Sequence, residues 1–194
     1  KSYQKSGLLD LAKNIIIFDN EHSSSISKYI KNTSNIIVLS KDNLGIAPAI
    51  KILTDITQTE YFLFLENDWV CVEDKPIVVS RIKQGLKFLE NKECDVIRYR
   101  HRFNYGEPLL SRKFHKGREL DFPEHLLDVI HWMSHPDLKF PEYIELLNSS
   151  SNTESWYRSR SSHANYTNNP SLYKTKFIQN ITSNSRVWSL NLMI

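Results

Sequence analysis

The sequence has few cysteines, few glycines and no long hydrophobic run. Two cysteines, Cys71 and Cys94, cannot staple a chain of 194 residues, which excludes a disulfide scaffold. No apolar stretch approaches the ~20 residues that a membrane-spanning helix requires. The five glycines form no phosphate-binding loop, which argues against a nucleotide hydrolase or a dinucleotide-binding enzyme. Neither a His-Glu-x-x-His zinc motif nor a Ser or Cys nucleophile elbow occurs.

A strong excess of charge is also lacking. Lys and Arg total 25 and Asp and Glu total 22, so the net charge of +3 is too small to predict a nucleic-acid partner. A hydrophobic content of 40% and a charged content of 24% are typical of a globular chain. The length suits one domain with a sizeable core. The chain begins at Lys1 rather than at methionine, so we expect a processed chain or a piece of a longer one.

Short hydrophobic runs alternate with helical patterns over the first hundred residues. Strands are expected at the β-branched or aromatic runs 14–18, 35–39, 61–65 and 95–99. Helices are expected over residues 1–12 and 22–31, after Gly45, and from an Asp74 cap to about Leu89. This alternation predicts an α/β fold with a mostly parallel central sheet flanked by helices.

The pattern weakens after residue 100. The second half is expected to be rich in loops, with short helices over 123–130 and 141–147. In open parallel sheets, ligands bind beyond the carboxyl ends of the strands. The polar residues that follow each expected strand are therefore the candidates for a functional site.

The strongest local signal is the segment Tyr61–Trp69, in which a hydrophobic strand leads into Glu66-Asn67-Asp68. Residues two apart point the same way in an extended chain, so the two carboxylates are expected to converge. Paired carboxylates suit Mg²⁺ or Mn²⁺, particularly when a diphosphate supplies further oxygen ligands. An inert exposed acidic turn has the same spacing and is the commoner structure.

The order of three segments resembles that of family 2-like glycosyltransferases with the A-type (GT-A) fold. These segments are NIIIFDNEHSS, NIIVLSKDNLGIAPAI and EYFLFLENDW, and a later Asn-Pro stretch at 169–170 also resembles the family. The resemblance covers about residues 1 to 178. It implies a nucleotide-sugar-binding half of about 1–103 and an acceptor side of about 104–194. The family's first strand has no counterpart after Lys1, so we expect a fragment that lacks it.

The resemblance also implies roles for particular residues. Asp19 would hydrogen-bond the base of the sugar donor, and Asn43 and Gly45 would shape the loop beside that donor. Asp68 would bind a divalent cation, Mn²⁺ or Mg²⁺, while Glu66 would contact the ribose, metal-bound water or the metal itself. Asp19 could instead cap the next helix, and Gly45 equally fits an ordinary helix start.

An inverting transfer needs a general base that takes the proton of the acceptor hydroxyl. The candidate carboxylates are Asp137, Glu142, Glu124 and Glu154. Trp156 follows Glu154 closely and could stack on a sugar, although a core tryptophan is the commoner arrangement.

Arg98, Arg100 and Arg102 alternate at the end of the fourth expected strand. Arginine forks suit phosphate oxygens, so Arg100 is a candidate contact for the donor diphosphate. A solvated edge strand explains the same pattern slightly better. Glycosylation sequons occur at Asn32, Asn148, Asn165 and Asn180, but they leave the localisation open.

The first functional hypothesis is therefore a metal-dependent glycosyltransferase, of the hexosyltransferase kind, that moves a sugar from a nucleoside-diphosphate-sugar donor to a hydroxyl of an unknown acceptor. The alternative is a catalytically weakened carbohydrate- or nucleotide-binding domain on the same fold. The missing first strand and the unassigned base favour this alternative. A nucleotidyltransferase is a third possibility, although its glycine-rich basic loop is not seen.

Overall fold

The described residues fold as a mixed α/β protein, and their strands form three small sheets. The computed structural model describes residues 2–19, 36–40, 43–66, 68–99, 133–149, 155–160 and 170–183. Two compact units are present, and the first combines Lys1–Ile97 with Ser171–Ile194 while the second is Arg98–Pro170. The helices expected over 22–31 and 123–130 lie outside the described residues.

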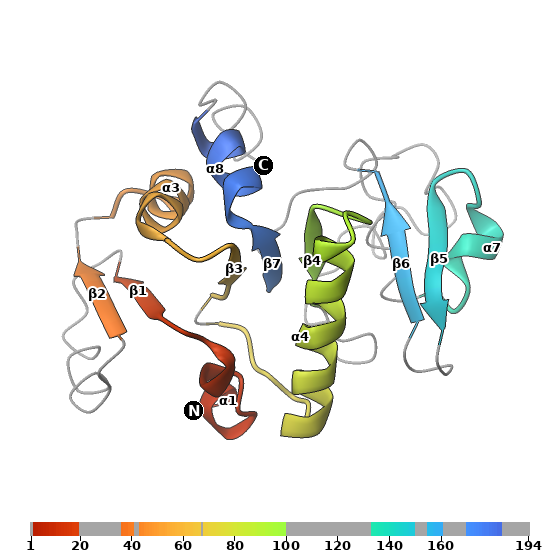
Figure 1. Cartoon of the computed structure of the whole chain (residues 1–194), viewed down its shortest axis with the longest axis horizontal. Helices are drawn as coiled ribbons and strands as arrows, with labels where there is room; N and C mark the ends of the chain where they lie inside the picture. The colour runs from red at the N-terminus through yellow and green to blue at the C-terminus, as the bar shows by residue number, and fades with distance from the viewer. Residues whose placement is uncertain are drawn as a thin grey trace. The chain divides into compact units, whose positions relative to one another are not determined.

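In the first unit, β1 (Ile15–Asp19) and β2 (Ile36–Ser40) form a parallel pair (Figure 1). The register aligns Ile15 with Ile36 and Asp19 with Ser40. Both strands are β-branched runs followed by polar residues, which is the pattern that predicted them. The first two strand predictions are therefore confirmed, with a shift of one residue at each end.

The second sheet has the order β3-β7-β4 and comprises β3 (Tyr61–Phe64), β7 (Ser171–Lys174) and β4 (Val96–Arg98). β3 and β7 are antiparallel. The described strands thus do not form the mostly parallel central sheet that the sequence predicted. β7 comes from the far end of the chain and inserts beside β3, a pairing that no local pattern specifies.

One face of this sheet packs against α3 (Ile46–Ile56) and α8 (Thr175–Ser183), which lie side by side (Figure 1). Ile50, Tyr173 and Ile178 form the buried cluster, with Phe62 and Phe64 packed against it. The two phenylalanines lie two residues apart on β3 and therefore share this face. The helix expected after Gly45 is confirmed as α3, whose apolar residues fall at helical spacing.

The opposite side of the sheet is covered by α4 (Lys75–Glu90), which packs against β7. Leu172 alternates with Tyr173 along β7 and is itself 4% exposed. Asp74 occupies the N-cap position of α4 as predicted, but its side chain makes no capping hydrogen bond. Pro76 in the first turn lacks an N–H group, so one fewer backbone donor needs a partner there.

The helix expected over residues 1–12 is broken into two short pieces. α1 (Ser2–Lys5) and the 3₁₀ turn η1 (Leu9–Leu11) are separated at Gly7, whose φ is +69°. Such a positive φ ends a right-handed helix, and glycine adopts it without steric cost. The aliphatic stem of Lys75 lies against Gly7, at 2.6–2.8 Å from where a Cβ would stand.

The second unit contains α7 (Pro136–Lys139) and an antiparallel hairpin of β5 (Ile144–Ser149) and β6 (Ser155–Ser159). The helix expected over 141–147 is therefore wrong. Ile144 is 1% exposed and packs against Phe140, while cross-strand pairing with β6 supplies the backbone hydrogen bonds. Tertiary pairing here overrides the helical spacing of the apolar residues.

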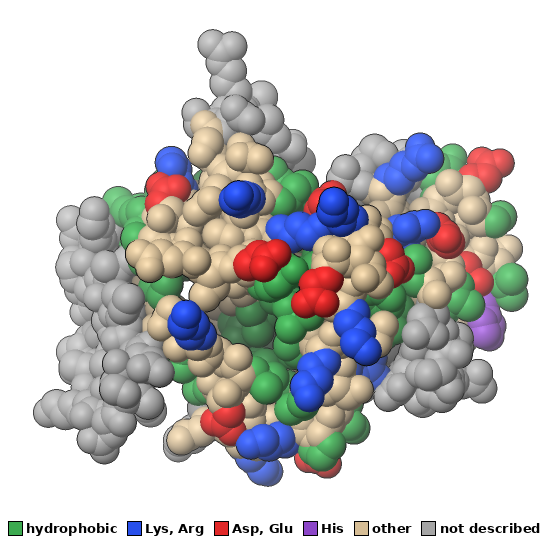
Figure 2. Space-filling model, in the orientation of Figure 1, with side chains coloured by type: hydrophobic (Ala, Val, Ile, Leu, Met, Phe, Trp, Pro, Cys, Tyr) green, Lys and Arg blue, Asp and Glu red, His purple; other side chains and the backbone are tan. Residues whose placement is uncertain are grey.

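Basic and acidic side chains are interspersed on the face of the molecule drawn in Figure 2. The same face is hollowed in the region where Figure 1 has β1, α3 and β3, and hydrophobic side chains are visible inside the hollow. Among the described residues, no helix is both long enough and apolar enough to cross a membrane.

Candidate functional site

The two acids singled out by the sequence lie in the loop between β3 and α4. β3 ends at Phe64, one residue earlier than predicted, and Asp68 lies in a turn. Glu66 is half-buried, whereas Asp68 is exposed. Strand alternation therefore does not align the two carboxylates, and the path of the loop decides where each of them points.

Tyr3 of α1 lies against this loop. Its hydroxyl donates a hydrogen bond of 2.8 Å to the backbone carbonyl of Glu66. Burial is the main cause that raises the pKa of Tyr3 to about 12, and the negative charges of Asp68, Cys71 and Glu66 contribute to this rise in that order. Both carboxylates thus act electrostatically on the phenol of Tyr3.

This pKa shift predicts a loss of stability at high pH. Folding raises the pKa of Tyr3 from 10.0 to about 12. The contribution of neutral Tyr3 to the free energy of unfolding is therefore complete below pH 10 and is lost as the pH rises through about 12. We expect the urea midpoint to fall over this interval, and to fall less in Tyr3→Phe. Urea unfolding of both proteins between pH 9 and pH 12 measures the difference, and parallel pH profiles would contradict the assignment.

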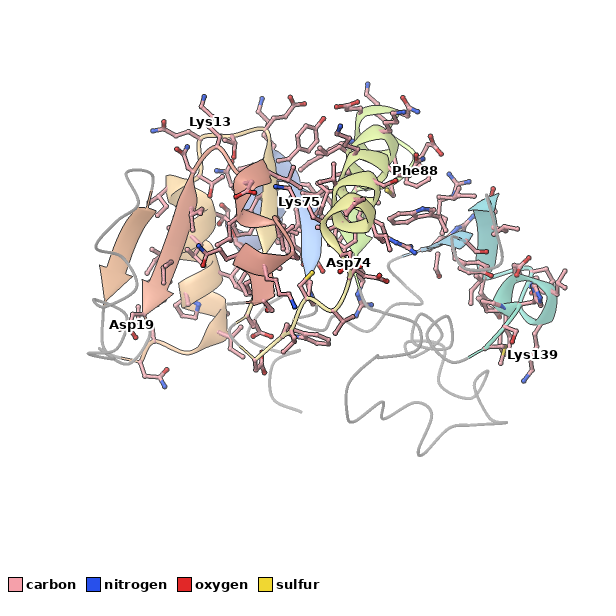
Figure 3. All side chains as sticks on the ribbon, turned by 90° about the horizontal axis from the view of Figure 1, so that it is seen from below. Lys13, Asp19, Asp74, Lys75, Phe88 and Lys139 are labelled. Atoms are coloured by element: carbon pink, nitrogen blue, oxygen red, sulfur yellow. The ribbon has the colours of Figure 1, made fainter. Side chains whose placement is uncertain are left out.

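Asp19 is the last residue of β1 and is 7% exposed (Figure 3). It lies opposite Ser40 in the register of the parallel pair. Two parallel strands end side by side here, so Asp19 lies at the carboxyl edge of its sheet, where the sequence predicted a ligand-binding residue. Its contact with a nucleotide base stays a prediction.

Asn43 and Gly45 together shape the start of α3. The Asn43 side-chain oxygen accepts a hydrogen bond of 2.9 Å from the backbone N–H of Gly45. Gly45 is the N-cap residue, with φ +76° and ψ 176°. The arrangement is a side-chain-stabilised turn that leads the chain into the helix, so it also explains these residues without a ligand.

The backbone of Gly45 predicts a stability cost for any side chain there. Its φ and ψ lie in a region that is nearly restricted to glycine, although the space around a new Cβ is open. Gly45→Ala is expected to lower the free energy of unfolding by about 1–3 kcal/mol. Gly45→Asn should cost a similar amount, because asparagine favours a different positive-φ region. Urea titration measures both, and a neutral asparagine variant would contradict the explanation.

The candidate bases that the structure describes lie in the second unit. Asp137 belongs to α7, and its Oδ1 atom is buried without a hydrogen-bond partner among the described residues. Glu142 is exposed in the turn before β5. Glu124, Glu154 and Arg100 lie outside the described residues, while Arg98 ends β4.

Trp156 lies on β6 and is half-buried. Tyr99 meets it edge-on, with ring centroids 6.2 Å apart and an interplanar angle of 83°. This geometry is a favourable packing arrangement for two aromatic rings. Trp156 therefore contributes to packing within the second unit, and its stacking on a sugar stays a prediction.

Sequence patterns did not reveal the part played by α1. Ser2 Oγ accepts a hydrogen bond of 3.3 Å from the backbone N–H of Cys71, and Tyr3 contacts Glu66 across 63 positions of the chain. No local pattern signals such a contact.

No family model matches the chain, and no curated protein or solved structure is significantly similar to it.

Proposed function

We propose that this chain is a metal-dependent glycosyltransferase domain of the GT-A type, which moves a sugar from a nucleoside-diphosphate sugar to an acceptor hydroxyl. The observation that carries the proposal is the loop after β3. There, Glu66 and Asp68 follow a hydrophobic strand, and both of their charges reach the phenol of Tyr3. The ordered segments around Asp19, Gly45 and Asp68 add to it.

The chemistry of the loop fits a hard divalent cation. No cluster of three or more His, Cys, Asp or Glu side chains suited to a metal ion occurs in the part of the chain that the structure describes. Mg²⁺ commonly binds through one or two carboxylates and takes its other ligands from water and substrate phosphates. Glu66 and Asp68 supply such a pair, with Asp68 exposed and accessible to a bound diphosphate.

In this proposal Glu66 and Asp68 hold the cation beside the donor. When bound, the cation supplies Lewis-acid neutralisation of the leaving diphosphate. Asp19, buried at the end of β1, accepts a hydrogen bond from a ring N–H of the nucleotide base. Asn43 fixes the turn at Gly45 and thereby the backbone beside the donor.

Transfer also requires a base that takes the proton of the acceptor hydroxyl, and the predicted candidates are Asp137, Glu142, Glu124 and Glu154. Of the two candidates that the structure describes, Asp137 has a buried Oδ1 atom that accepts no hydrogen bond from a described residue. Glu142 is exposed, and both residues stay candidates for the base.

A second candidate function is donor binding without turnover. The metal and nucleotide residues belong to the first unit, whereas Asp137 and Glu142 belong to the second. Binding would require the first unit alone, whereas transfer requires a base as well. The base stays unassigned, which favours this alternative.

Calorimetric titration with UDP- and GDP-sugars, with and without Mn²⁺, tests the proposal. The expected result is binding of one donor that requires Mn²⁺, together with slow release of free nucleoside diphosphate. Donor binding without any release would favour the binding domain. If neither donor binds with Mn²⁺ present, the glycosyltransferase proposal is wrong.

A further inference from the structure

Residues 2–10, which we name the N-terminal clasp, contact the loop 65–74 and the first residue of α4. Tyr3 binds the carbonyl of Glu66 at 2.8 Å, and Ser2 accepts from the N–H of Cys71 at 3.3 Å. Asp10 forms an ion pair of 2.7 Å with Lys75. The contacts are therefore made near the beginning, in the middle and just beyond the end of the loop.

Two of these contacts are hydrogen bonds to the backbone of the loop 65–74, so they act on the conformation of the loop itself. Tyr3 and Ser2 bind backbone groups of the loop, so they constrain its path rather than the rotamer of one side chain. The Lys75 stem lies against Gly7, where the absence of a Cβ permits the close approach. The Lys75 and Asp10 side chains are both largely exposed, so their ion pair adds little stability. The two hydroxyl contacts are therefore the specific part of the clasp.

We propose that Tyr3 is a positioning residue that sets the conformation of the loop carrying Glu66 and Asp68. The loop is long, and Asp68 lies in a turn outside any strand, so its direction depends on what holds the backbone on either side. The Tyr3 hydroxyl is bound to the carbonyl of Glu66 itself, two residues before Asp68. The roles of these two acids rest on the proposed function. If they bind a cation, the affinity for that cation depends on the Tyr3 hydroxyl, although this hydroxyl is not itself a ligand of the cation.

The test compares Tyr3→Phe with Tyr61→Phe in the full chain. Both changes remove one phenolic hydroxyl, but Tyr61 begins β3 and its hydroxyl interacts with Glu60 instead. Hydrogen exchange is measured on peptides covering 65–74 and, as an internal reference, on α8. We expect exchange in 65–74 to be about fivefold faster in Tyr3→Phe, with α8 and the Tyr61→Phe protein unchanged.

Mn²⁺ titration of the same proteins supplies the second measurement. Removing a residue that orients a metal ligand typically weakens metal affinity by about 10–100-fold, and we expect about tenfold for Tyr3→Phe. Ser2→Ala, which removes the weaker contact at Cys71, should act in the same direction with a smaller effect. It also provides a milder variant should Tyr3→Phe fail to fold.

The outcomes separate the clasp from the proposed function. If wild-type protein binds no Mn²⁺ while Tyr3→Phe still speeds exchange in 65–74, the metal site fails and the clasp stands. Equal exchange in Tyr3→Phe, Ser2→Ala and Tyr61→Phe would overturn the clasp. So would a general rise in exchange that includes α8, because it would mark a loss of global stability instead.

Discussion

Replacing Asp68 with alanine is expected to remove Mn²⁺-dependent binding of the nucleotide-sugar donor. Asp68 is the exposed acid of the loop after β3, and its charge acts together with that of Glu66 on Tyr3. A cation held by two carboxylates loses half of its charged protein ligands in this variant. Donor affinity measured calorimetrically in Mn²⁺ should fall at least about 30-fold, which corresponds to about 2 kcal/mol.

Asp74→Ala is the matched control for this experiment. It also removes one aspartate carboxylate from the loop 65–74. Asp74 is exposed, and its side chain makes no capping hydrogen bond to α4. Asp74→Ala should leave donor affinity within about twofold of wild type, a change below 0.5 kcal/mol. Equal effects of the two variants would show that only the net charge of the loop matters. Unchanged metal-dependent binding in Asp68→Ala would rule out the metal-site assignment.

Replacing Ile178 with alanine is expected to have the largest effect on stability. Ile178 is 1% exposed and packs with Ile50 and Tyr173 where α8 and α3 cover the sheet. Truncating a buried isoleucine loses its transfer free energy and leaves a cavity, because the surrounding side chains relax only in part. The free energy of unfolding should fall by about 2–5 kcal/mol, as measured by urea titration.

Ile46→Ala makes the same change at an exposed position. Ile46 begins α3 and is 44% exposed, so the change creates little cavity, and alanine is the better helix former. Its cost should stay below about 1 kcal/mol. A comparable cost for both variants would mean that the cluster around Ile178 does not stabilise the first unit as its burial indicates.

The elements predicted best are those whose residues all lie within one short segment. β1, β2 and β3 are hydrophobic runs bounded by polar residues, and α3 and α4 have apolar residues at helical spacing. In α3 and α4 the local pattern and the tertiary burial agree, since the buried residues include Ile50 and Leu53 in α3 and Val78 and Leu89 in α4. Where they disagree, as at 141–147, the pairing of β5 with β6 decided the structure.

The candidate site was only partly predictable, because local patterns in the sequence do not specify contacts between distant segments. The acids after β3 were found because a hydrophobic strand that leads into two carboxylates is a local signal. Strand alternation does not fix the mutual arrangement of these acids, because β3 ends at Phe64 and Asp68 lies in a turn, and their convergence stays a prediction. Tyr3 was not found, since its contact with Glu66 depends on how distant segments pack.

The sequence by itself determined β1, β2, β3, α3 and α4 of the first unit, and it located the acidic loop and the glycine at the start of α3. Those features follow from hydrophobic periodicity and backbone preference, which act over a few residues. Only the tertiary structure decided that β7 pairs with β3 and that Tyr3 of α1 forms a hydrogen bond with the loop at Glu66. Such contacts join residues more than 60 positions apart, and packing, not local preference, selects them.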